Sequence, residues 1–477
     1  GQLELDFTIS VEESTDQVTI TPTAHPGPTS TVEPAASVEP TDLPTRTPTA
    51  TPVPAVAVFE DELTLTMYDY VPALYTDPSS GLPYPLLNHD QVGPPVNRTF
   101  RTIVLRNEYL EVTILPELGG RSYPCRFVPT GQPLLYNNPV IKPTHWGPPE
   151  MGWWLAVGGI EFALPVEEHG YLTAQPWEAS VAREGDGSAT VVLQILEKSR
   201  GLYTRVEVTL RPGEAAIHVA PSIRNDSGSS QQFQFWTNAM LSPGRHGVGP
   251  EAQIAFPADQ VIVHSRGDLS LPPEGATMPW PVYAGRDLSS YGEWQNWLGF
   301  FGPERWAPYM GLYDQATEIG MVHSADPAVL PGAKVFGPGR DFDTSVYSDD
   351  GAHYIELWSG ITPTFGQSVI LPAGASLAWG EIWYVVSQSE GITVANEHAS
   401  LHVWGEQGVI RLTVASPAAH RWRMLAQQHG VVLEDLVFDV QPDLPYRATL
   451  PQSTDPGAPL DVQILDLEGD LVLEHVY

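Results

Sequence analysis

The chain has 477 residues, more than a single hydrophobic core of usual size holds, so we expect two or three domains. Hydrophobic residues make up 42% of it, which is ample for globular cores, while 57 acidic and 23 basic side chains give a net charge of −34. Such a charge repels nucleic-acid phosphates and anionic membrane surfaces, so nucleic acid is excluded as an expected partner.

The cysteine count and the hydropathy of the sequence exclude two further features, a disulfide and a membrane-spanning helix. Cys125 is the single cysteine, so an internal disulfide is excluded. No apolar run reaches the roughly 20 residues that a membrane-spanning helix needs, so we expect no membrane span. The chain begins at Gly1 without an initiator Met, which we interpret as a mature, processed chain.

Residues 1–20 form the first predicted segment, in which apolar and polar residues alternate with a period of two. This period indicates a β-strand with one buried face. The apolar positions are Leu3, Leu5, Phe7, Ile9 and Val11. A single strand needs a host for its apolar face and backbone groups. That host is either another molecule, through strand addition, or another part of the same chain.

Residues 21–55 are predicted to be a linker. Nine of these 35 residues are Pro and nine are Thr, a composition that buries no core and favours extended polyproline II. Pro/Thr-rich stalks of this kind are typical of exported proteins. We therefore expect an extracellular, secreted or cell-surface protein, of bacterial type.

The remaining chain is predicted to be all-β. Residues 56–397 contain many short stretches rich in β-branched and aromatic residues, separated by Gly, Pro, Asn and Asp, which favours a large antiparallel β-sandwich. Residues 398–477 continue with short strands and a turn predicted at Gly469. About 80 residues of this kind suit a small immunoglobulin-like sandwich.

Six sequence blocks, in their order and spacing, resemble the galactose mutarotase-like superfamily, and most closely an uncharacterised bacterial branch of it. The resemblance covers roughly residues 56–385. The blocks are LPELGGRSY (115–123), NNPVIKPTHWGP (137–148), WWLAVGGIEFALP (153–165), FQFWTNAM (233–240), GLYDQATEIGMVHSADPAVLPGAKVFGPG (311–339) and HYIELWSGITPTFGQ (353–367).

The resemblance implies a β-supersandwich with a sugar pocket and assigns roles to three residues. Glu356 matches the glutamate that serves the family as catalytic base. His169, with Gly170, resembles a His-Gly pair that contacts the sugar, and Glu161 lies where the pocket-lining Gly-Gly segment continues. Mutarotase chemistry needs a carboxylate and an acid, usually histidine, on opposite sides of one sugar ring.

The chain also departs from the family pattern. The family's acid histidine follows a Thr-Asn pair, but here Asn238 is followed by Ala239, which has no proton to give. Asn238 remains a candidate substrate contact, and His323 is the candidate for the missing acid. Two arginines of the hexose-phosphate branch are replaced by Val157 and Thr173, so a bidentate phosphate clamp is not expected.

Several candidates have a structural alternative. Glu161 is either a pocket carboxylate or a buried partner of Arg121, which is kept as a further substrate-binding candidate. His169 is either a pocket ligand or a structural hydrogen-bond partner. Glu356 shares a strand face with aromatic neighbours, which indicates either an aromatic-lined cleft or a packed core. Sugar-stacking platforms are sought among the 14 tryptophans, and the candidates are Trp153, Trp306 and Trp358.

No histidine pair with zinc spacing and no phosphate-cradling glycine loop is found, so neither a metal nor another cofactor is expected. Two hypotheses about function follow. The first is a surface protein that binds or processes carbohydrate, with catalytic activity left open because of Ala239. The second is a structural subunit of an extracellular filament, linked by residues 3–11 to an open sheet edge of a neighbouring copy.

Overall fold

In the computed structural model, residues 54–302, 307–406, 408–451 and 459–477 are described. The predicted strand over residues 3–11 and nearly all of the predicted linker, residues 21–55, lie outside these ranges, as does Trp306. The described residues belong to one compact unit, residues 53–477.

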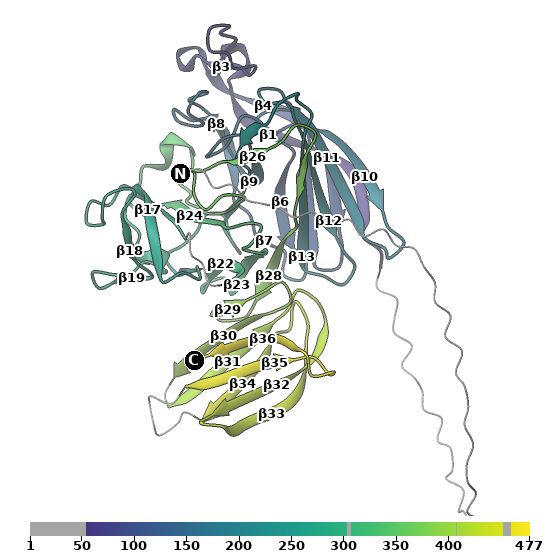
Figure 1. Ribbon diagram of the computed structural model, residues 1–477, viewed down its shortest axis with the longest axis vertical. Coiled ribbons are helices and arrows are strands. Elements are labelled where there is room, and N and C mark those ends of the chain that lie inside the picture. The colour runs from purple at the N-terminus through teal and green to yellow at the C-terminus, as the bar shows by residue number, and fades with distance from the viewer. Residues whose placement is uncertain (1–53, 303–306, 407, 452–458) are drawn as a thin grey trace, which may run out of the picture. The chain divides into compact units, whose positions relative to one another are not determined.

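The described part of the chain is almost entirely β-structure, so the predicted all-β fold class is confirmed (Figure 1). Its helical segments are four short 3₁₀ turns. They are η1 (Val71–Ala73), η2 (His89–Gln91), η3 (Tyr291–Glu293) and η4 (Thr344–Val346). No helix in the described ranges has the length and apolar character needed to cross a membrane.

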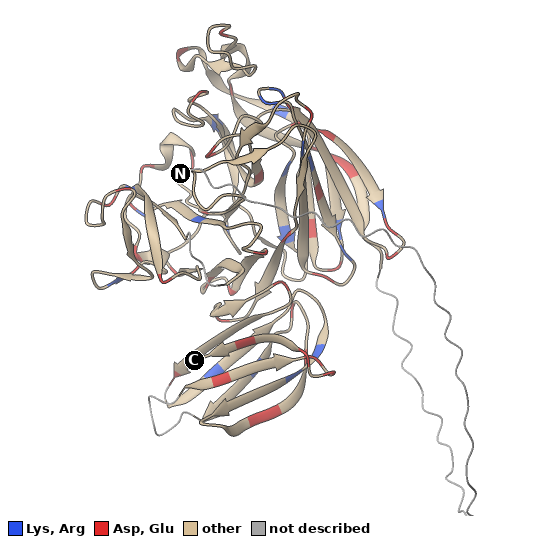
Figure 2. Ribbon diagram, in the orientation of Figure 1, with Lys and Arg blue, Asp and Glu red and all other residues tan. Residues whose placement is uncertain are grey.

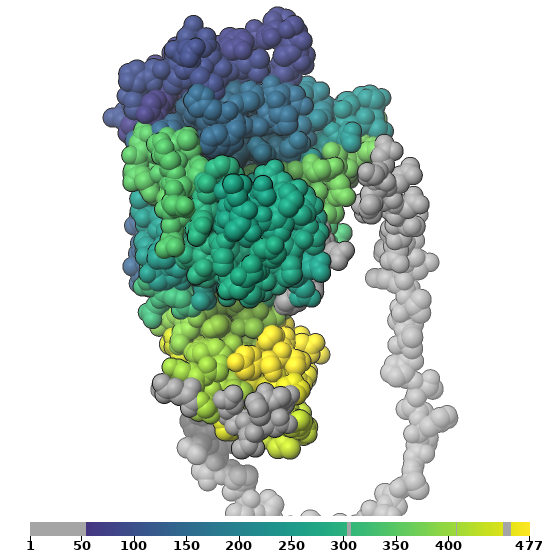
Figure 3. Space-filling view, turned by 90° about the vertical axis from the view of Figure 1, so that its left-hand side faces the viewer, coloured from purple at the N-terminus to yellow at the C-terminus, as the bar shows by residue number. Residues whose placement is uncertain are grey.

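The largest sheet has 13 strands and is antiparallel except where β1 pairs with β8. Its order across the sheet is β18 (Thr277–Pro279), β17 (Gln260–Arg266), β21 (Trp297–Phe301), β24 (Gly332–Pro338), β25 (Ile355–Gly360), β15 (Trp236–Leu241), β9 (Leu155–Ala163), β8 (Asn137–Pro143), β1 (Ala57–Asp69), β4 (Gly93–Arg106), β5 (Leu110–Leu115), β6 (Arg121–Phe127) and β7 (Gln132–Pro133). The residues around β17 to β20 gather as a rounded lobe on the face shown in Figure 3.

The second sheet has nine strands. Its order is β10 (Glu178–Arg183), β11 (Ala189–Glu197), β12 (Leu202–Leu210), β13 (Ala216–Asn225), β28 (Glu381–Ser387), β23 (Ile319–Ser324), β22 (Tyr309–Asp314) and β16 (Ala252–Ala255), with β27 (Ser376–Ala378) beside β13. Three two-stranded ribbons complete this region. They are β2 (Leu74–Tyr75) with β3 (Leu86–Leu87), β14 (Gln231–Phe233) with β26 (Val369–Leu371), and β19 (Val282–Tyr283) with β20 (Arg286–Asp287).

The C-terminal residues form two four-stranded antiparallel sheets. One contains β29 (Val394–Ala395), β30 (Ser400–Glu406), β31 (Val409–Ala415) and β34 (Tyr446–Pro451), and the other contains β33 (Val431–Val440), β32 (His420–Gln428), β35 (Leu460–Leu465) and β36 (Leu471–Val476). The turn predicted at Gly469 joins β35 to β36, with a φ of +95°. β29 lies just before the predicted boundary at residues 397 and 398 and pairs with β30.

Strand burial differs between the two large sheets, and this difference indicates where polar side chains face a cavity. In β12, residues of odd and even number alternate strictly between half-exposed and buried, which is the pattern of a strand with one face in the core. In β9, β15 and β25 every residue is buried, because both faces of these strands are covered. A polar side chain on such a strand must be hydrogen-bonded or face a cavity.

Two adjacent glycines let β9 pack closely against its neighbours. Gly158 and Gly159 have φ values of +102° and +81°, where a side chain is strained. A Cβ atom at Gly158 would lie 2.3 Å from the carbonyl oxygen of Tyr136, and one at Gly159 would lie 2.2 Å from that of Ser122. The pair therefore allows the backbone of β9, which carries Glu161, to approach the backbone at Tyr136 and Ser122 closely.

Acidic and basic residues are spread over the strands and loops of the two large sheets and of the two C-terminal sheets (Figure 2).

Candidate functional site

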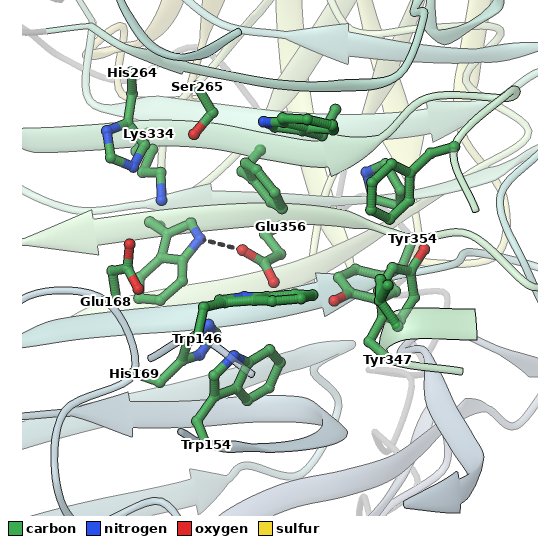
Figure 4. A pocket seen from close by; sticks show the side chains of 16 residues that line it. Trp146, Trp154, Glu168, His169, His264, Ser265, Lys334, Tyr347, Tyr354 and Glu356 are labelled. Atoms are coloured by element: carbon green, nitrogen blue, oxygen red, sulfur yellow. Dashed lines mark hydrogen bonds between the residues drawn. The ribbon is translucent and has the colours of Figure 1, made fainter. Parts of the chain in front are cut away.

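A cavity of about 430 Å³ lies over one face of the strands β24 and β25. Most of its walls are aromatic, and its titratable side chains come from separate elements (Figure 4). The lining residues are Trp146, Trp154, Glu168, His169, His264, Ser265, Trp297, Lys334, Phe336, Pro338, Phe342, Val346, Tyr347, Tyr354, Glu356 and Trp358. Trp146 and Trp297 are 42% and 39% exposed, so they offer indole surface to an entering ligand.

Strand β25 and the residue before it supply three of the lining residues, through the alternation of side chains along the strand. Tyr354, just before the strand, and Glu356 and Trp358 within it face the cavity, whereas Ile355 and Leu357 join the main core. Trp358 donates a hydrogen bond of 2.8 Å from Nε1 to Oε2 of Glu356. Burial raises the pKa of Glu356 above its ordinary value, although the charges of His169 and Lys334 oppose the rise.

His169 follows β9 in a tight turn and lies against Trp154. The two rings are stacked with their centroids 3.5 Å apart and their planes at 12°, and the Trp358 ring meets the imidazole edge-on at 5.3 Å. Gly170 makes this turn possible, because a Cβ at its φ of +61° would lie 2.3 Å from the backbone of Leu164. The imidazole is therefore held by aromatic contacts on one ring face and at one edge.

A buried carboxylate orients this imidazole. Oε1 of Glu161 lies 2.5 Å from Nδ1 of His169 and also accepts a 3.1 Å hydrogen bond from Nδ2 of Asn238. Oε2 of Glu161 pairs with Arg121 at 3.4 Å, and both side chains are fully buried. Burial alone would raise the pKa of Glu161, but His169, Arg121 and Asn238 hold it below its ordinary value. Because Nδ1 is engaged, Nε2 is the ring nitrogen that remains for a ligand.

Arg121 is a structural cation rather than part of the cavity wall. Its guanidinium donates to the carbonyl oxygens of Leu118, Gly158 and Thr173 at 2.8–3.0 Å, besides pairing with Glu161. Of the two alternatives for Glu161, the structure shows the buried partner of Arg121, and the same carboxylate also positions His169. Glu161, Arg121 and Asn238 lie behind the cavity as its support.

Two further basic side chains, Lys334 and His264, line the cavity. Burial lowers the pKa of the Lys334 amine to about 8, against the opposing effect of Glu356 and Glu168. Burial, with the nearby charge of Lys334, lowers the pKa of His264 to about 2, so this imidazole is neutral. Figure 4 shows His264, Lys334 and Glu168 on one side of the cavity and Tyr347 and Tyr354 on the other, with Glu356 between them.

Of the site residues predicted from the sequence, two lie apart from the cavity and one lies outside the described residues. His323 is on β23 in the nine-stranded sheet, fully buried, with Nε2 2.9 Å from Oε2 of Glu381. Trp153 packs in the main core against Tyr70, with ring centroids 5.7 Å apart, and its neighbour Trp154 is the cavity tryptophan. Trp306 falls in the range 303–306, which the structure does not describe.

Ala239 does not face the cavity. It belongs to the core between the two large sheets, as does Leu357 beside it on β25, whereas Asn238 on the opposite strand face reaches Glu161. A histidine at position 239 of this backbone would point into that core. The absence of an imidazole there therefore leaves the cavity itself unchanged, and His169 supplies one from the turn after β9.

Sequence reasoning missed Lys334, His264, Trp154 and Tyr347. Lys334 carried a usable signal, because the chain has only three lysines and this one stands between Ala333 and Val335 in an apolar strand. His264 and Tyr347 reach the cavity from β17 and from the residue after η4, whose positions depend on the whole sheet. No group of three or more His, Cys, Asp or Glu in the described ranges is placed to hold a metal ion.

Residues 78–371 match the model of a protein family described as a domain of unknown function, DUF5107. The chain belongs to this family. The DUF5107 region contains every cavity residue named above, from Trp146 on the loop after β8 to Trp358 on β25.

A solved structure shares the fold of most of this chain. A TPR-domain-containing protein from Parabacteroides distasonis matches with a TM-score of 0.61 and 22% identity over 71% of this chain, which spans 56% of that protein's length. A galactose mutarotase-like protein from Clostridium acetobutylicum matches with a TM-score of 0.43 and 11% identity, covering 60% of this chain and 96% of that one. A putative mutarotase from Salmonella typhimurium matches with a TM-score of 0.42 and 9% identity, covering 66% and 95%.

Proposed function

We propose that the cavity binds a sugar ring of a carbohydrate, with Glu356 and His169 as the pair that transfers protons. The observation that carries this proposal is the placement of a buried carboxyl and an oriented imidazole in one aromatic-walled cavity. Indole and phenol rings stack on the apolar faces of sugars, while a small number of polar groups fix the orientation of the hydroxyls.

The surroundings of Glu356 and His169 suit proton transfer. A carboxyl whose pKa is raised by burial is a better base than an exposed one and still returns the proton at moderate pH. His169, whose Nδ1 faces the carboxylate of Glu161, presents Nε2 as donor or acceptor. Glu356 would take the proton of the anomeric hydroxyl, as the resemblance implies, and His169 would serve as the acid. This assignment replaces His323 with His169.

The test is calorimetric titration of the chain with neutral monosaccharides and oligosaccharides, followed by measurement of anomer interconversion by NMR for each sugar that binds. We expect at least one sugar to bind and Glu356→Gln to lower any interconversion rate by about 10²-fold or more. The matched control is Glu117→Gln, which changes an exposed carboxylate paired with Arg101. Absence of binding across a broad panel would refute the proposal, and binding without turnover would restrict it to recognition.

We also propose that the protein is extracellular, on the strength of the Pro/Thr-rich composition of residues 21–55. Cell fractionation of the source organism with an antibody to the chain tests this. The filament hypothesis depends on residues 3–11, which lie outside the described ranges.

A further inference from the structure

Lys334 is a buried cation without a partner among the described residues. It is 3% exposed, lies on β24 and extends into the cavity (Figure 4). The described part of the chain buries one other arginine or lysine side chain, Arg121, and that guanidinium has an ion pair and three further hydrogen bonds. For Lys334, the described residues provide no hydrogen bond and no carboxylate within 4.0 Å of Nζ.

Aromatic rings take the place of polar partners around this amine. Nζ lies 4.4 Å from the ring centroid of Phe365 and 4.7 Å from that of Trp358, with Phe336 at 5.3 Å and Phe301 at 5.9 Å. Cation–π attraction offsets part of the lost hydration. It leaves the three N–H donors of the ammonium unsatisfied, and burying a charge in this state costs several kcal/mol.

The position is chemically unusual for this chain. Of 23 basic residues only three are lysines, and the other two are Lys142, which pairs with Asp349, and the exposed Lys198. A lysine held in an apolar strand without a partner is expensive for folding, so its donors are expected to be used by a ligand.

We propose that Lys334 binds the carboxylate of an acidic sugar, such as a uronic acid, and so selects acidic over neutral sugars in this cavity. This inference rests on the proposed function, since it names the class of sugar that the same cavity takes. The ligand carboxylate supplies the acceptor that the described residues do not supply, and the aromatic walls contact the ring that carries it.

The neighbouring carboxyl groups decide between ligand classes. Glu356 and Glu168 both interact with Lys334 electrostatically, and Glu168 opposes the binding of an anion. The Glu356 carboxylate opposes it as well, and this repulsion acts more strongly on a doubly charged phosphate than on a singly charged carboxylate. The lining residues include no arginine, so the bidentate clamp that favours phosphate is missing from the described cavity. A singly charged carboxylate is therefore favoured over a phosphate.

The experiment compares matched sugar pairs by isothermal titration calorimetry at pH 7. D-Galacturonate is compared with D-galactose and D-glucuronate with D-glucose, each pair differing only in a carboxylate or a hydroxymethyl group at one carbon. A charge-assisted hydrogen bond predicts that one uronate binds about tenfold or more tightly than its neutral parent. In Lys334→Met, which keeps the apolar stem, the ratio of the two dissociation constants falls to about one. The control Lys198→Met keeps the wild-type ratio.

The outcomes separate this inference from the function on which it rests. Equal binding of uronate and parent sugar by the wild-type chain, which needs no variant, overturns the role of Lys334 and leaves sugar binding intact. A preference that persists in Lys334→Met, with its fold verified by thermal unfolding, also overturns that role. Tighter binding of D-galactose 6-phosphate than of D-galacturonate overturns the carboxylate assignment. Failure of acidic and neutral sugars alike to bind refutes both proposals.

Discussion

Glu161 and His169 are joined by a 2.5 Å contact between Oε1 and Nδ1, which ties the buried strand β9 to the cavity wall. The carboxylate has two further partners, Arg121 and Asn238, from β6 and β15. Three strands that are distant in sequence therefore meet at one carboxylate, and that carboxylate sets the orientation of one imidazole. Four predictions about this region concern stability and ligand binding.

The first prediction concerns the charge of Glu161. Glu161→Gln leaves the Arg121 guanidinium buried without an anion, so we expect the free energy of unfolding to fall by about 3–5 kcal/mol. Urea denaturation at pH 7 measures this change. The control Glu117→Gln breaks an exposed pair with Arg101 and should leave the denaturation midpoint almost unchanged. Equal effects of the two variants would contradict a central role for the buried pair.

The second prediction concerns the pH dependence of stability at Glu356. Its pKa in the folded chain is raised above 4.5, so the folded state binds more protons than the unfolded state in the interval above that pH. The stability that protonated Glu356 contributes is fully present below about pH 4.5 and is lost as pH rises through its folded pKa.

Glu356→Gln, which stays neutral, should therefore unfold at nearly the same urea concentration as the wild type near pH 4 and become relatively more stable as pH rises. Urea denaturation of both chains from pH 4 to 8 measures the difference. A difference that stays constant over this interval would show that burial does not perturb Glu356.

The third prediction uses the adjacent residues Trp153 and Trp154. Trp154→Phe shortens the stacking surface on His169 and in the cavity, so we expect sugar affinity to fall by about three- to tenfold. Trp153→Phe reduces packing against Tyr70 in the main core and should lower the melting temperature without changing affinity. Titration calorimetry and thermal unfolding of both variants measure the two effects. Loss of sugar affinity in Trp153→Phe but not in Trp154→Phe would show that the sugar does not bind in this cavity.

The fourth prediction concerns the turn that presents His169. An alanine at Gly170 has its Cβ 2.3 Å from the backbone of Leu164, so the turn must open and the imidazole must move. Gly131→Ala is the matched control, because its φ of +74° is similar but no atom lies within 4 Å of the added Cβ. The control should cost about 1–2 kcal/mol of left-handed strain. Gly170→Ala should cost more and also weaken sugar binding, whereas equal losses in urea denaturation would exclude a role for close packing.

Local patterns in the sequence predicted the strands well, because a period of two reports directly on which face of a strand is buried. The alternation around Glu356 also placed Tyr354 and Trp358 on its side of β25, and the structure shows all three facing the cavity. The choice of Trp153 over Trp154 had no such support, because both residues precede β9 and no local pattern indicates which of the two rings faces the cavity.

Residues that depend on distant elements could not be found in this way. His323 was the candidate for the missing acid, but β23 lies in the other large sheet, where Glu381 accepts its hydrogen bond. The departure at Ala239 suggested a missing acid, yet residue 239 faces the core, and the imidazole that reaches the cavity comes from the turn after β9. Each of these outcomes depends on which strands pair, which a single strand does not encode.

The sequence by itself determined the all-β class, the position of many strands and the face of β25 that carries Glu356, because these follow from local alternation and turn residues. The tertiary structure decided which polar groups share a cavity. His169, Lys334 and Glu356 come from three separate segments, with Glu161 on β9 behind His169, and only the order of β24, β25, β15 and β9 in one sheet brings them together. The physical reason is that cross-strand neighbours are set by the pairing of whole strands, whereas side-chain alternation is set within each strand.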